Sequence, residues 1–271
     1  MSRVVVVVTF NSTRDLPALL EGLADEHVVL VDNASTDDTV AVARRAKPDV
    51  AIIENPDNRG FATAVNQGLA AAAGRDVFLA NPDLVISSAS ISALEDELGR
   101  HPRAAVIAPR LRHPDGRIQD SARTFPSVAT MAARRTPLGR TRWGRGIEAR
   151  HSGDPTAWTG ASRPVDWALG AALMIRAEAV AAVGGMHEGF FMYEEDIDWC
   201  GQLWRAGWEV RYAPEIEAIH GYGRASRRTM DLREPATRYH WVSVLRLAAR
   251  WPREVVLGRP LRPHDEPPAA P

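Results

Sequence analysis

Short apolar runs alternate with helical patterns along the first hundred residues of the chain. Each run is too short for a helix and is rich in β-branched residues, which is typical of a buried strand. The expected strands are residues 3–9, 27–31, 50–54 and 77–80. Between them apolar residues recur at helical spacing, as the leucines of residues 16–23 do. This alternation predicts an α/β fold with a mostly parallel sheet covered by helices.

Each expected strand ends in a polar loop. Asn11, Asp32 and Asn58 lie in the first three loops, and Asp83 lies in the fourth. Pro82 cannot donate to a sheet ladder, so the fourth strand must end before it. Parallel strands present their carboxyl ends at one edge, and open α/β sheets bind ligands outside that edge. These polar side chains therefore indicate a binding site.

Asp83 and Asp32 indicate the chemistry of this site. A carboxylate at Asp83 suits Mg²⁺ or Mn²⁺ together with the phosphates of a substrate. The other interpretation of Asn81-Pro82-Asp83 is a plain turn whose side chains bond their own backbone. Asp32 can accept the N3–H of a uracil or thymine ring. The chain contains neither GxGxxG nor GxxxxGK[ST], so no Rossmann dinucleotide site and no P-loop is indicated.

The middle of the chain is less regular. Residues 104–112 and 117–123 are expected to be short strands around a turn, and residues 165–176 are expected to form one buried strand. Residues 125–164 lack periodicity and are expected to form a long loop. Such a loop is either a solvated insertion or a flap over an acceptor or a phosphate. Its arginines include Arg134, Arg135, Arg140, Arg142, Arg145 and Arg150.

Four acids lie within five positions near residue 196. They are Glu194, Glu195, Asp196 and Asp198. Acids in the first turn of a helix favour its macrodipole, which explains one or two of them. Like charges at i,i+3 and i,i+4 otherwise repel, and the neighbouring aromatic residues indicate a pocket for the rest. Those aromatic residues are Phe190, Phe191, Tyr193 and Trp199.

The C-terminal part carries one histidine of interest and one amphipathic helix. His220 ends a strand expected over residues 216–223, and a lone histidine is most often structural. Three arginines follow it and suit a diphosphate, namely Arg224, Arg227 and Arg228. The helix expected over residues 234–257 lies on an anionic membrane, packs on the domain or forms a dimer. Its expected apolar side comprises Trp241, Val244, Leu245, Ala248 and Trp251.

Composition narrows the class of protein. The chain has 271 residues, 45% of them hydrophobic, and a formal net charge of −1, which argues against bulk nucleic-acid binding. The single cysteine, Cys200, excludes an internal disulfide and fits a reducing compartment. No apolar run approaches the ~20 residues needed to span a bilayer. We therefore expect a cytoplasmic protein.

Four motifs in order resemble glycosyltransferase family 2, and they are closest to its bacterial rhamnosyltransferase-like branch. They are TFN at residues 9–11, VDNASTDDT at 31–39, NRGFATAVNQG at 58–68 and ANPD at 80–83. The resemblance implies a GT-A fold, with a mostly parallel nucleotide-binding sheet flanked by helices and a C-terminal helical extension. It also implies a nucleotide-sugar donor, a divalent metal (Mn²⁺ or Mg²⁺) and inversion at the anomeric carbon.

The resemblance also implies roles for individual residues. Asp196 matches the family's general base, and Asp83 with His220 matches its metal site. The residues implied in nucleotide-sugar binding are Thr9, Asn11, Asp32, Asn33, Asn58, Arg59, Gly60, Asn81 and Asp83. Those implied in acceptor binding are Trp167, Gly170, Ala171 and Glu195. One departure is Gln202, where the family often has an arginine, and this puts an acceptor or phosphate contact in doubt.

The resemblance therefore implies an inverting, metal-dependent transfer of L-rhamnose from dTDP-L-rhamnose to a lipid-linked or polymeric cell-envelope saccharide. The alternatives are a UDP-hexose or UDP-galactofuranose donor, a soluble metabolite as acceptor, and a nucleotide-sugar-binding protein without turnover. We expect a glycosyltransferase domain over residues 1–228, divided into a nucleotide-sugar half (1–100) and an acceptor half (101–228). A helical extension (229–258) and a Pro-rich disordered tail (259–271) are expected to follow. The enzyme would be cytoplasmic and peripheral at the inner face of the membrane.

Overall fold

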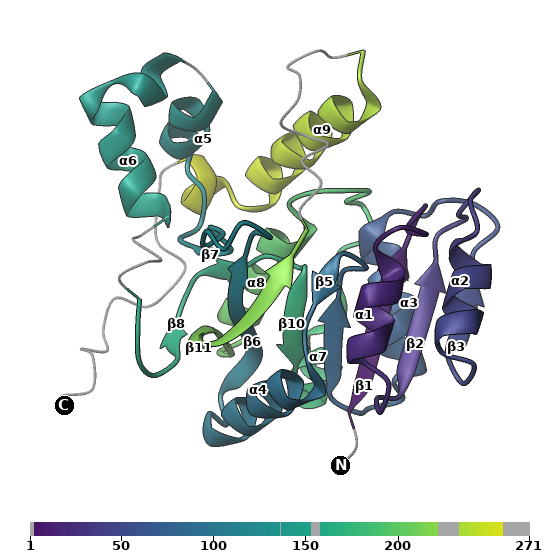
Figure 1. Cartoon of the computed structure of the whole chain (residues 1–271). Coiled ribbons are helices and arrows are strands. Elements are labelled where there is room, and N and C mark those ends of the chain that lie inside the picture. The colour runs from purple at the N-terminus through teal and green to yellow at the C-terminus, as the bar shows by residue number, and fades with distance from the viewer. Residues whose placement is uncertain (1–2, 136, 153–157, 222–232, 257–271) are drawn as a thin grey trace.

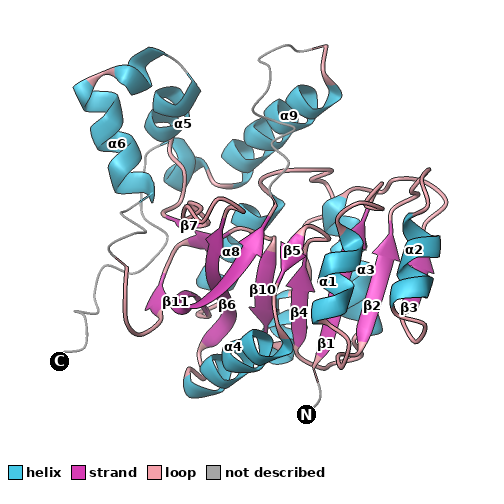
Figure 2. Cartoon of the chain, viewed as in Figure 1, coloured by secondary structure: helices cyan, strands magenta, loops and turns pink. Residues whose placement is uncertain are grey.

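A central sheet with helices on both faces makes up most of the molecule (Figures 1 and 2). The structure is a computed structural model of the chain, and it describes residues 3–135, 137–152, 158–221 and 233–256. In these residues the sheet has nine strands in the order β3-β2-β1-β4-β10-β6-β11-β5, and β8 pairs with β11. The predicted tail at 259–271 and the arginines at 224, 227 and 228 lie outside the described residues.

The first half of the sheet is parallel, as the alternation of the sequence predicts. Along β1, Val4 and Val6 belong to one apolar core, whereas Val5 and Val7 belong to the core on the other face. A strand buried on both faces in this way reads as a continuous apolar run. This half consists of β1 (Val4–Thr9), α1 (Leu16–Gly22), β2 (Val28–Asp32), α2 (Thr39–Ala46), β3 (Ala51–Glu54), α3 (Phe61–Ala71) and β4 (Val77–Ala80).

The second half makes the sheet mixed. β10 (Ala172–Ile175) is antiparallel to both of its neighbours, β4 and β6, while β11 is parallel to β6 and antiparallel to β5. α1, α2 and α4 pack on one face, and α3, α7 and α8 pack on the other. The other elements of this half are β5 (Leu84–Val85), α4 (Ser88–Arg100), β6 (Ala104–Arg112), β8 (Arg163–Pro164), α7 (Ala177–Val183), α8 (Glu195–Arg205) and β11 (Glu209–His220).

The single strand predicted over residues 165–176 is wrong. The segment forms β9 (Trp167–Ala168), which pairs with β7 (Ala122–Arg123) in a separate two-stranded sheet, and then β10 in the main sheet. Between them Leu169 donates its backbone N–H to the Ser121 carbonyl at 2.8 Å. Gly170 donates its backbone N–H to the Asp196 carboxylate instead of to a strand. The break thus turns one backbone donor toward an acidic side chain.

The long loop predicted over residues 125–164 is also wrong in its first part. It contains α5 (Val128–Arg135), the 3₁₀ turn η1 (Pro137–Arg140) and α6 (Arg142–Ser152). Ser127 caps α5, because its Oγ accepts the Thr130 N–H at 3.2 Å. Both helices are short, with eight residues in α5 and eleven in α6. In Figure 1 α5 and α6 stand above the carboxyl edge of the sheet.

The predicted C-terminal helix is present as α9 (Pro235–Arg250), followed by the π-helical turn η3 (Pro252–Val256). Its predicted apolar side is wrong in part. Leu247 and Trp251 are buried against the domain, and the Trp251 ring lies 5.4 Å from that of Phe125. Leu245, in contrast, is 68% exposed. The helix therefore packs on the domain through one face and leaves the opposite face open.

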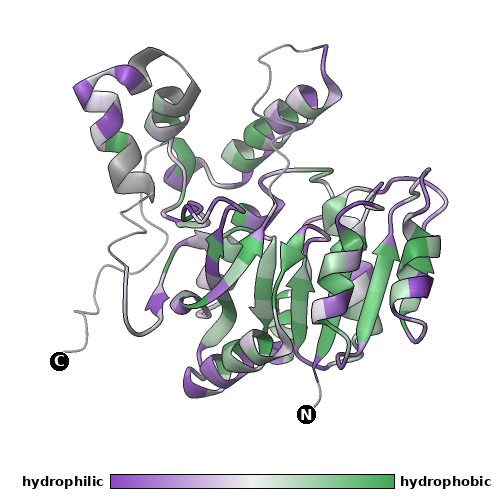
Figure 3. Ribbon diagram, viewed as in Figure 1, coloured by the Kyte–Doolittle hydropathy of each residue, from purple (hydrophilic) through white to green (hydrophobic). Residues whose placement is uncertain are grey.

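Two further features follow from the burial pattern. Apolar residues colour the central strands in Figure 3, and none of the helices in the described residues is long and apolar enough to cross a membrane. Cys200 lies on α8 with no exposed surface, and burial raises the pKa of its thiol to about 12. The thiol is therefore protonated and chemically inert at neutral pH.

Candidate active site

Asp32 ends β2 in the position that the sequence predicts, beside Thr9 at the end of β1. The Thr9 hydroxyl donates to Asp32 Oδ1 at 2.9 Å, and Ser35 donates its hydroxyl to Oδ1 at 2.6 Å and its backbone N–H to Oδ2 at 2.9 Å. A carboxylate offers about four acceptor sites. In the described residues Asp32 therefore keeps one acceptor site on Oδ2 beyond these three bonds.

Asn11 and Ala34 shape the two loops beside Asp32. Both are non-glycine residues in the left-handed region, with φ of 51° and 66°. The Asn11 side chain accepts the Thr36 N–H at 2.8 Å, and the Asn11 N–H donates to the Ser35 hydroxyl at 2.9 Å. Left-handed conformations of such residues are uncommon and recur at functional sites. These loops hold each other in place at the carboxyl edge.

Asn33 connects the second loop to the third. Its side-chain amide donates to Asn58 Oδ1 at 2.9 Å and to the Gly60 carbonyl at 3.1 Å, while its oxygen accepts the Arg59 N–H at 3.0 Å. Asn55 donates to the same oxygen at 3.1 Å. Asn33 is 3% exposed, and its side chain forms these hydrogen bonds with other residues of the protein. The structure thus places Asn33 and Asn58 at the predicted edge as a brace for the loops.

Gly60 joins this brace to the acidic segment. It has φ +83°, and a Cβ there would lie 2.5 Å from the Phe191 carbonyl oxygen. That carbonyl accepts the Phe61 N–H at 2.9 Å. Only glycine allows both the backbone conformation and this close approach. The NRGF motif therefore contacts the chain just before α8.

Asp83 and His220, far apart in the sequence, meet as predicted. Asp83 Oδ1 lies 3.2 Å from His220 Nε2, and Asn81 Nδ2 lies 3.3 Å from the same nitrogen. The pairing of β5 with β11 positions them, because Leu84 is opposite His220 in the register. His220 is 2% exposed and Asp83 is 21% exposed, so the pair is reached from the Asp83 side. Among the described residues no third His, Cys, Asp or Glu joins them.

Gln119 holds the other side of the His220 ring. Its Oε1 lies 3.0 Å from His220 Nδ1, and its Nε2 donates to the His220 carbonyl at 2.7 Å. Gln119 is 5% exposed and lies between the hairpin turn and β7. Sequence reasoning missed this residue, because nothing local to a single glutamine indicates a contact with a histidine 101 positions away.

Asp196 lies at the start of α8 and is buried. Gly170 donates its N–H to Oδ2 at 3.1 Å, and Ile197 donates its N–H to Oδ1 at 2.8 Å. Burial raises the pKa of the Asp196 carboxyl above its usual range, while these N–H groups and the positive charge of Arg123 oppose the rise. Arg123 is a second residue that sequence reasoning missed. A buried carboxyl with a raised pKa is suited to accept a proton.

The turn into α8 is strained. Tyr193 and Glu194 are consecutive non-glycine residues with φ of 71° and 66°. Each such conformation costs on the order of 1 kcal/mol and persists only where its surroundings impose it. Here α9 supplies part of those surroundings, since Ser243 donates to the Met192 carbonyl at 2.8 Å and His240 lies 3.5 Å from Glu194. The aromatic pocket wall predicted here is only partly present, because Phe190 and Trp199 are fully buried in the core.

A series of hydrogen bonds links Asp196 to the pair of Asp83 and His220. Gly170 donates to Asp196, and the carbonyl of the next residue, Ala171, accepts the Asn81 N–H at 2.9 Å. Asn81 in turn contacts His220 through its side chain at 3.3 Å. β10 and β4 are adjacent in the sheet, which keeps this order of contacts. Residues from four distant parts of the chain therefore meet in one region.

The predicted acceptor residues are all largely covered. Trp167 is 5% exposed and donates its indole N–H to the Thr124 carbonyl at 2.9 Å, and Ala171 is 1% exposed. Glu195 is 7% exposed, and its Oε2 has no hydrogen-bond partner in the described residues. Burial and the charge of Asp196 raise the pKa of Glu195 well above its usual range. Burial and the neighbouring charge therefore favour the neutral form of Glu195.

Asp198 differs from its neighbours because its carboxylate accepts hydrogen bonds from three side chains. Oδ1 accepts from Arg250 Nε at 2.6 Å and from Trp251 Nε1 at 2.7 Å, and Oδ2 accepts from Gln202 Nε2 at 2.7 Å. Asp198 is 0% exposed. Gln202 and a guanidinium from α9 thus donate to the same carboxylate. Asp198 anchors α9 to α8.

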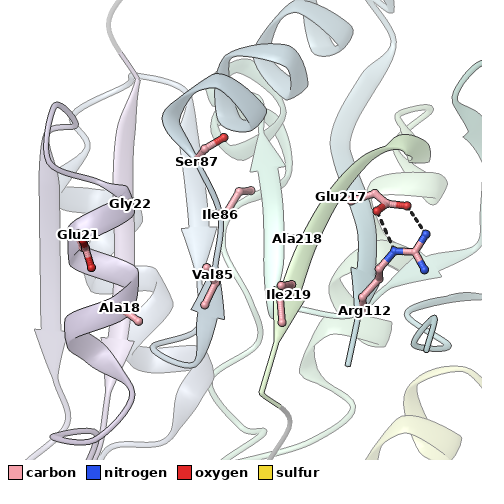
Figure 4. Close-up of a pocket in the computed structure, with 10 residues that line it drawn as sticks. All are labelled: Ala18, Glu21, Gly22, Val85, Ile86, Ser87, Arg112, Glu217, Ala218 and Ile219. Atoms are coloured by element: carbon pink, nitrogen blue, oxygen red, sulfur yellow. Dashed lines mark hydrogen bonds and ion pairs between the residues drawn. The ribbon is translucent and has the colours of Figure 1, made fainter. Parts of the chain in front are cut away.

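A separate hollow of about 550 Å³ lies between α1, β5 and β11 (Figure 4). Val85 and Ile219 line it, and the ion pair of Arg112 with Glu217 closes one side at 2.6 and 2.7 Å. None of the predicted site residues lines this hollow. It is therefore distinct from the region around Asp196.

Comparison with known proteins agrees with these features. The model of the family described as glycosyl transferase family 2 matches residues 4–156, and that of glycosyl transferase family group 2 matches residues 120–258. An N-acetylglucosaminyl-diphospho-decaprenol L-rhamnosyltransferase of Mycobacterium tuberculosis is 35% identical over 243 residues, which cover 83% of this chain and 77% of the relative. Rhamnosyltransferase WbbL of Escherichia coli is 38% identical over 86 residues, which are 32% of this chain and 31% of the relative.

Solved structures of similar shape support the fold. The mannosyltransferase PcManGT from Pyrobaculum calidifontis, in complex with GDP-Man and Mn²⁺, has a TM-score of 0.58 at 19% identity and covers 92% of this chain and 64% of its own. S. aureus TarS 1–349 in complex with UDP has a TM-score of 0.55 at 17% identity and covers 83% of this chain and 61% of its own. The predicted GT-A fold is confirmed, and the chain belongs to glycosyl transferase family 2 as a rhamnosyltransferase-like glycosyltransferase.

Proposed function

We propose that this glycosyltransferase moves L-rhamnose from dTDP-L-rhamnose to a hydroxyl of a lipid-linked saccharide, with inversion at the anomeric carbon. The observation that carries the proposal is the series of contacts from Asp196 through Gly170, Ala171 and Asn81 to His220. It brings a buried carboxyl with a raised pKa and a candidate metal pair into one region. Both relatives are named as rhamnosyltransferases, and the name of the M. tuberculosis relative includes a diphospho-decaprenol acceptor, which supports the sugar and the lipid-linked acceptor. The dTDP carrier is part of the proposal.

In this proposal Asp196 is the general base. It takes the proton of the acceptor hydroxyl while the oxygen forms a bond to the anomeric carbon and the bond to the diphosphate breaks. The products are the new glycoside, dTDP and a protonated Asp196. The Gly170 N–H at 3.1 Å holds the carboxylate in orientation. The charge of Arg123 lowers the pKa of Asp196 against the effect of burial, which favours the ionised form that accepts the proton.

Asp83 and His220 would hold a divalent cation, whose charge neutralises the departing diphosphate. The residues fit such an ion. Asp83 Oδ1 and His220 Nε2 lie 3.2 Å apart, and a carboxylate oxygen and an imidazole nitrogen are both ligands of Mn²⁺. Solved structures of the same fold contain Mn²⁺ together with a nucleotide or a nucleotide-sugar.

The nucleotide would lie at the edge formed by the loops after β1, β2 and β3. The acceptor site left on Asp32 Oδ2 suits the N3–H of thymine or uracil. Thr9, Asn11, Asn33, Asn58, Arg59 and Gly60 shape this edge, and Asn81 and Asp83 border it. Glu195 and the segment from Trp167 to Ala171 would lie on the acceptor side of the site. That side would face the inner surface of the cytoplasmic membrane.

The experiment is a transfer assay with a polyprenyl-diphosphate-linked N-acetylglucosamine acceptor and dTDP-L-rhamnose, with UDP-glucose and UDP-galactofuranose as competing donors. Calorimetry with dTDP, UDP and GDP, each with and without Mn²⁺, accompanies it. We expect transfer from dTDP-L-rhamnose and metal-dependent binding of pyrimidine nucleotides. Equal affinity for GDP would contradict the role of Asp32, transfer from a UDP-sugar would replace the donor, and binding without any transfer would leave a non-catalytic protein.

A further inference from the structure

We propose that Gln119 is a positioning residue, which holds His220 in the tautomer that carries its proton on Nδ1 and so presents the lone pair of Nε2 to a metal. The proposal rests on the metal site of the proposed function. It concerns a residue that does not touch the metal, and it follows from which atoms around Gln119 are able to donate.

The orientation of the Gln119 amide is determined by its neighbours. Its Nε2 lies 2.7 Å from the His220 carbonyl oxygen and 3.3 Å from the Arg112 carbonyl oxygen. Carbonyl oxygens only accept hydrogen bonds, so the NH₂ end of the amide must face them. The opposite orientation would place the amide oxygen against both carbonyls. Oε1 is therefore the atom that faces the histidine ring.

The tautomer of His220 follows from that orientation. Oε1 lies 3.0 Å from Nδ1, and an oxygen acceptor requires the hydrogen to be on the nitrogen. In a neutral ring Nε2 then carries the lone pair, and the Asn81 amide group at 3.3 Å donates to it. Gln119 and His220 are 5% and 2% exposed, so water does not substitute for these bonds.

This tautomer also explains the geometry at Asp83. With its lone pair on Nε2, His220 presents an acceptor to Asp83 Oδ1, which is a second acceptor 3.2 Å away. Two acceptors at this distance need a proton or a metal cation between them, and a metal bound by both atoms would use the lone pair of Nε2. Metal-bound histidines are generally oriented by a partner of the other ring nitrogen, and loss of that partner weakens metal binding about 10- to 100-fold.

The test uses protein labelled with ¹⁵N-histidine and free of metal. Ring-nitrogen spectra of the wild type, with His220→Gln to assign the signals, are expected to show hydrogen on Nδ1. In Gln119→Leu the ring is expected to shift toward the Nε2–H form, which would donate to Asp83. Gln119→Glu, whose carboxyl must be protonated to donate to the His220 carbonyl, keeps an acceptor at Nδ1 and is the control expected to preserve the hydrogen on that nitrogen. Mn²⁺ affinity in the presence of dTDP is expected to fall about 10- to 100-fold in Gln119→Leu alone.

The outcomes separate this proposal from the proposed function. Hydrogen on Nε2 in the wild type, or an unchanged tautomer in Gln119→Leu, would overturn the role of Gln119. A changed tautomer with unchanged Mn²⁺ affinity would leave the orientation of His220 in place and remove the metal site instead. If Gln119→Leu fails to fold, the wild-type spectrum and Gln119→Glu still decide the tautomer.

From a different observation we infer a membrane-facing surface on the outer sides of α5, α6 and α9. Six of the nine large apolar side chains that are exposed in the described residues belong to these helices and to η3. Monomeric proteins rarely gather exposed apolar groups without a partner. We call this set the outer surface, and its members are Val128, Trp143, Tyr239, Val242, Leu245 and Val256.

The exposed apolar residues of α9 lie on one face of that helix. Val242 and Leu245 are three positions apart and are 53% and 68% exposed, whereas Leu247 and Trp251 are buried. At 100° per residue these pairs lie on opposite sides of the helix. α9 and the α5–α6 pair both rise from the carboxyl edge of the sheet (Figures 1 and 3), and the contact of Phe125 with Trp251 joins their bases.

The charge of the outer surface favours an anionic partner. α9 contains three arginines and no acidic residue between Pro235 and Arg250, and one of the three, Arg250, pairs with Asp198. Arg142 and Arg145 are exposed beside Trp143 on α6. Apolar side chains flanked by arginines are the composition of helices that lie at the surface of an anionic bilayer. The occupant we infer is therefore an anionic lipid surface, which also carries the acceptor of the proposed function.

The test is co-sedimentation with vesicles of phosphatidylglycerol and phosphatidylcholine, with pure phosphatidylcholine as reference. We expect salt-sensitive binding to the anionic vesicles only. The double variant Val242→Glu, Leu245→Glu should partition at least about tenfold less, because burial of one such side chain is worth about that factor. Val85→Glu is the control, since Val85 is 46% exposed but lies outside the outer surface.

Other outcomes would overturn the inference or assign a different partner to the outer surface. Absence of binding to anionic vesicles, or unchanged binding by the double variant, would contradict it. A dimer of the wild type that the double variant abolishes would make the same face an interface between two copies of the chain. Transfer to a short-chain, water-soluble acceptor is expected to persist in the double variant. Vesicle binding without any transfer would leave the surface intact and refute the proposed function.

Discussion

Asp196 and Asp198 lie two residues apart on one helix, yet their surroundings differ in every respect that matters for chemistry. Asp198 accepts three strong hydrogen bonds from Arg250, Trp251 and Gln202. Asp196 accepts only backbone N–H groups, and burial raises its pKa. A carboxylate with charged and aromatic donors is tied to the scaffold, whereas one with a raised pKa is available for a proton.

The comparison shows that helix geometry assigns these roles. Residues two apart point about 200° away from each other, so one acid faces β10 and the other faces α9. The same four-acid cluster therefore supplies a candidate base, an acid whose pKa is raised, and an anchor.

The largest effect is expected for Asp196→Asn. The amide is nearly isosteric but cannot accept the proton, so we expect transfer at least about a hundredfold slower with unchanged dTDP affinity. Single-turnover transfer and donor calorimetry measure the two quantities. Near-normal transfer by this variant would remove Asp196 as the base.

Asp198→Asn should lose stability instead. The variant removes the charge that pairs with Arg250 in a fully buried place, although Arg250 itself is 32% exposed and can turn to water. We expect a loss of about 2–3 kcal/mol in the free energy of unfolding, measured by urea titration. Transfer per folded molecule should stay close to that of the wild type. A selective loss of transfer with unchanged stability would exchange the roles of the two aspartates.

Gln202→Met tests the weakest of the three donors to Asp198. It removes one hydrogen bond to a carboxylate that keeps two others, so a loss of about 1 kcal/mol in the free energy of unfolding is expected. The same urea titration detects it. If the loss equals that of Asp198→Asn, then Gln202 rather than α9 is the main partner of the anchor.

Glu195→Gln should have the smallest effect on the free energy of unfolding at moderate pH. Burial already favours the protonated form of Glu195, which the amide resembles. The unfolded chain releases this proton near pH 4.3, whereas the folded chain holds it to higher pH. The wild type therefore loses stability as the pH rises above that value through the raised pKa, and the variant does not. Urea titrations at pH 5 and at pH 8.5 measure the free energy of unfolding of both proteins. We expect the variant to become more stable relative to the wild type only at the higher pH. Equal curves at both would show that Glu195 ionises normally.

The parallel half of the fold was predictable because its local signals agree with its tertiary structure. The valines of β1 are buried on both faces, so their apolar run needs no alternation to be recognised as a strand. The prediction of one strand over residues 165–176 is wrong because small and apolar residues continue through Gly170, although the chain there changes sheets. Between the two strands Gly170 contacts Asp196, and no local pattern encodes that contact.

The candidate site was predictable where a family motif names the residue and not where a distant partner does. Asp83, His220 and Asp196 were all singled out from motifs, and the first two do meet. Gln119, Arg123 and Arg250 were missed because each acts on a residue far away in the sequence. Trp167 and Ala171 were predicted to face an acceptor, and the structure buries both.

The burial of Cys200 has a practical consequence for tracking this protein on a bilayer. It is the single cysteine of the chain, and its thiol is covered and protonated. A cysteine introduced by Leu245→Cys would thus be the one thiol that a maleimide dye reaches, with no background mutation to remove others. An environment-sensitive dye at that position reports how deeply α9 inserts into lipid. The wild-type protein, whose buried thiol does not react with the dye, is the unlabelled control.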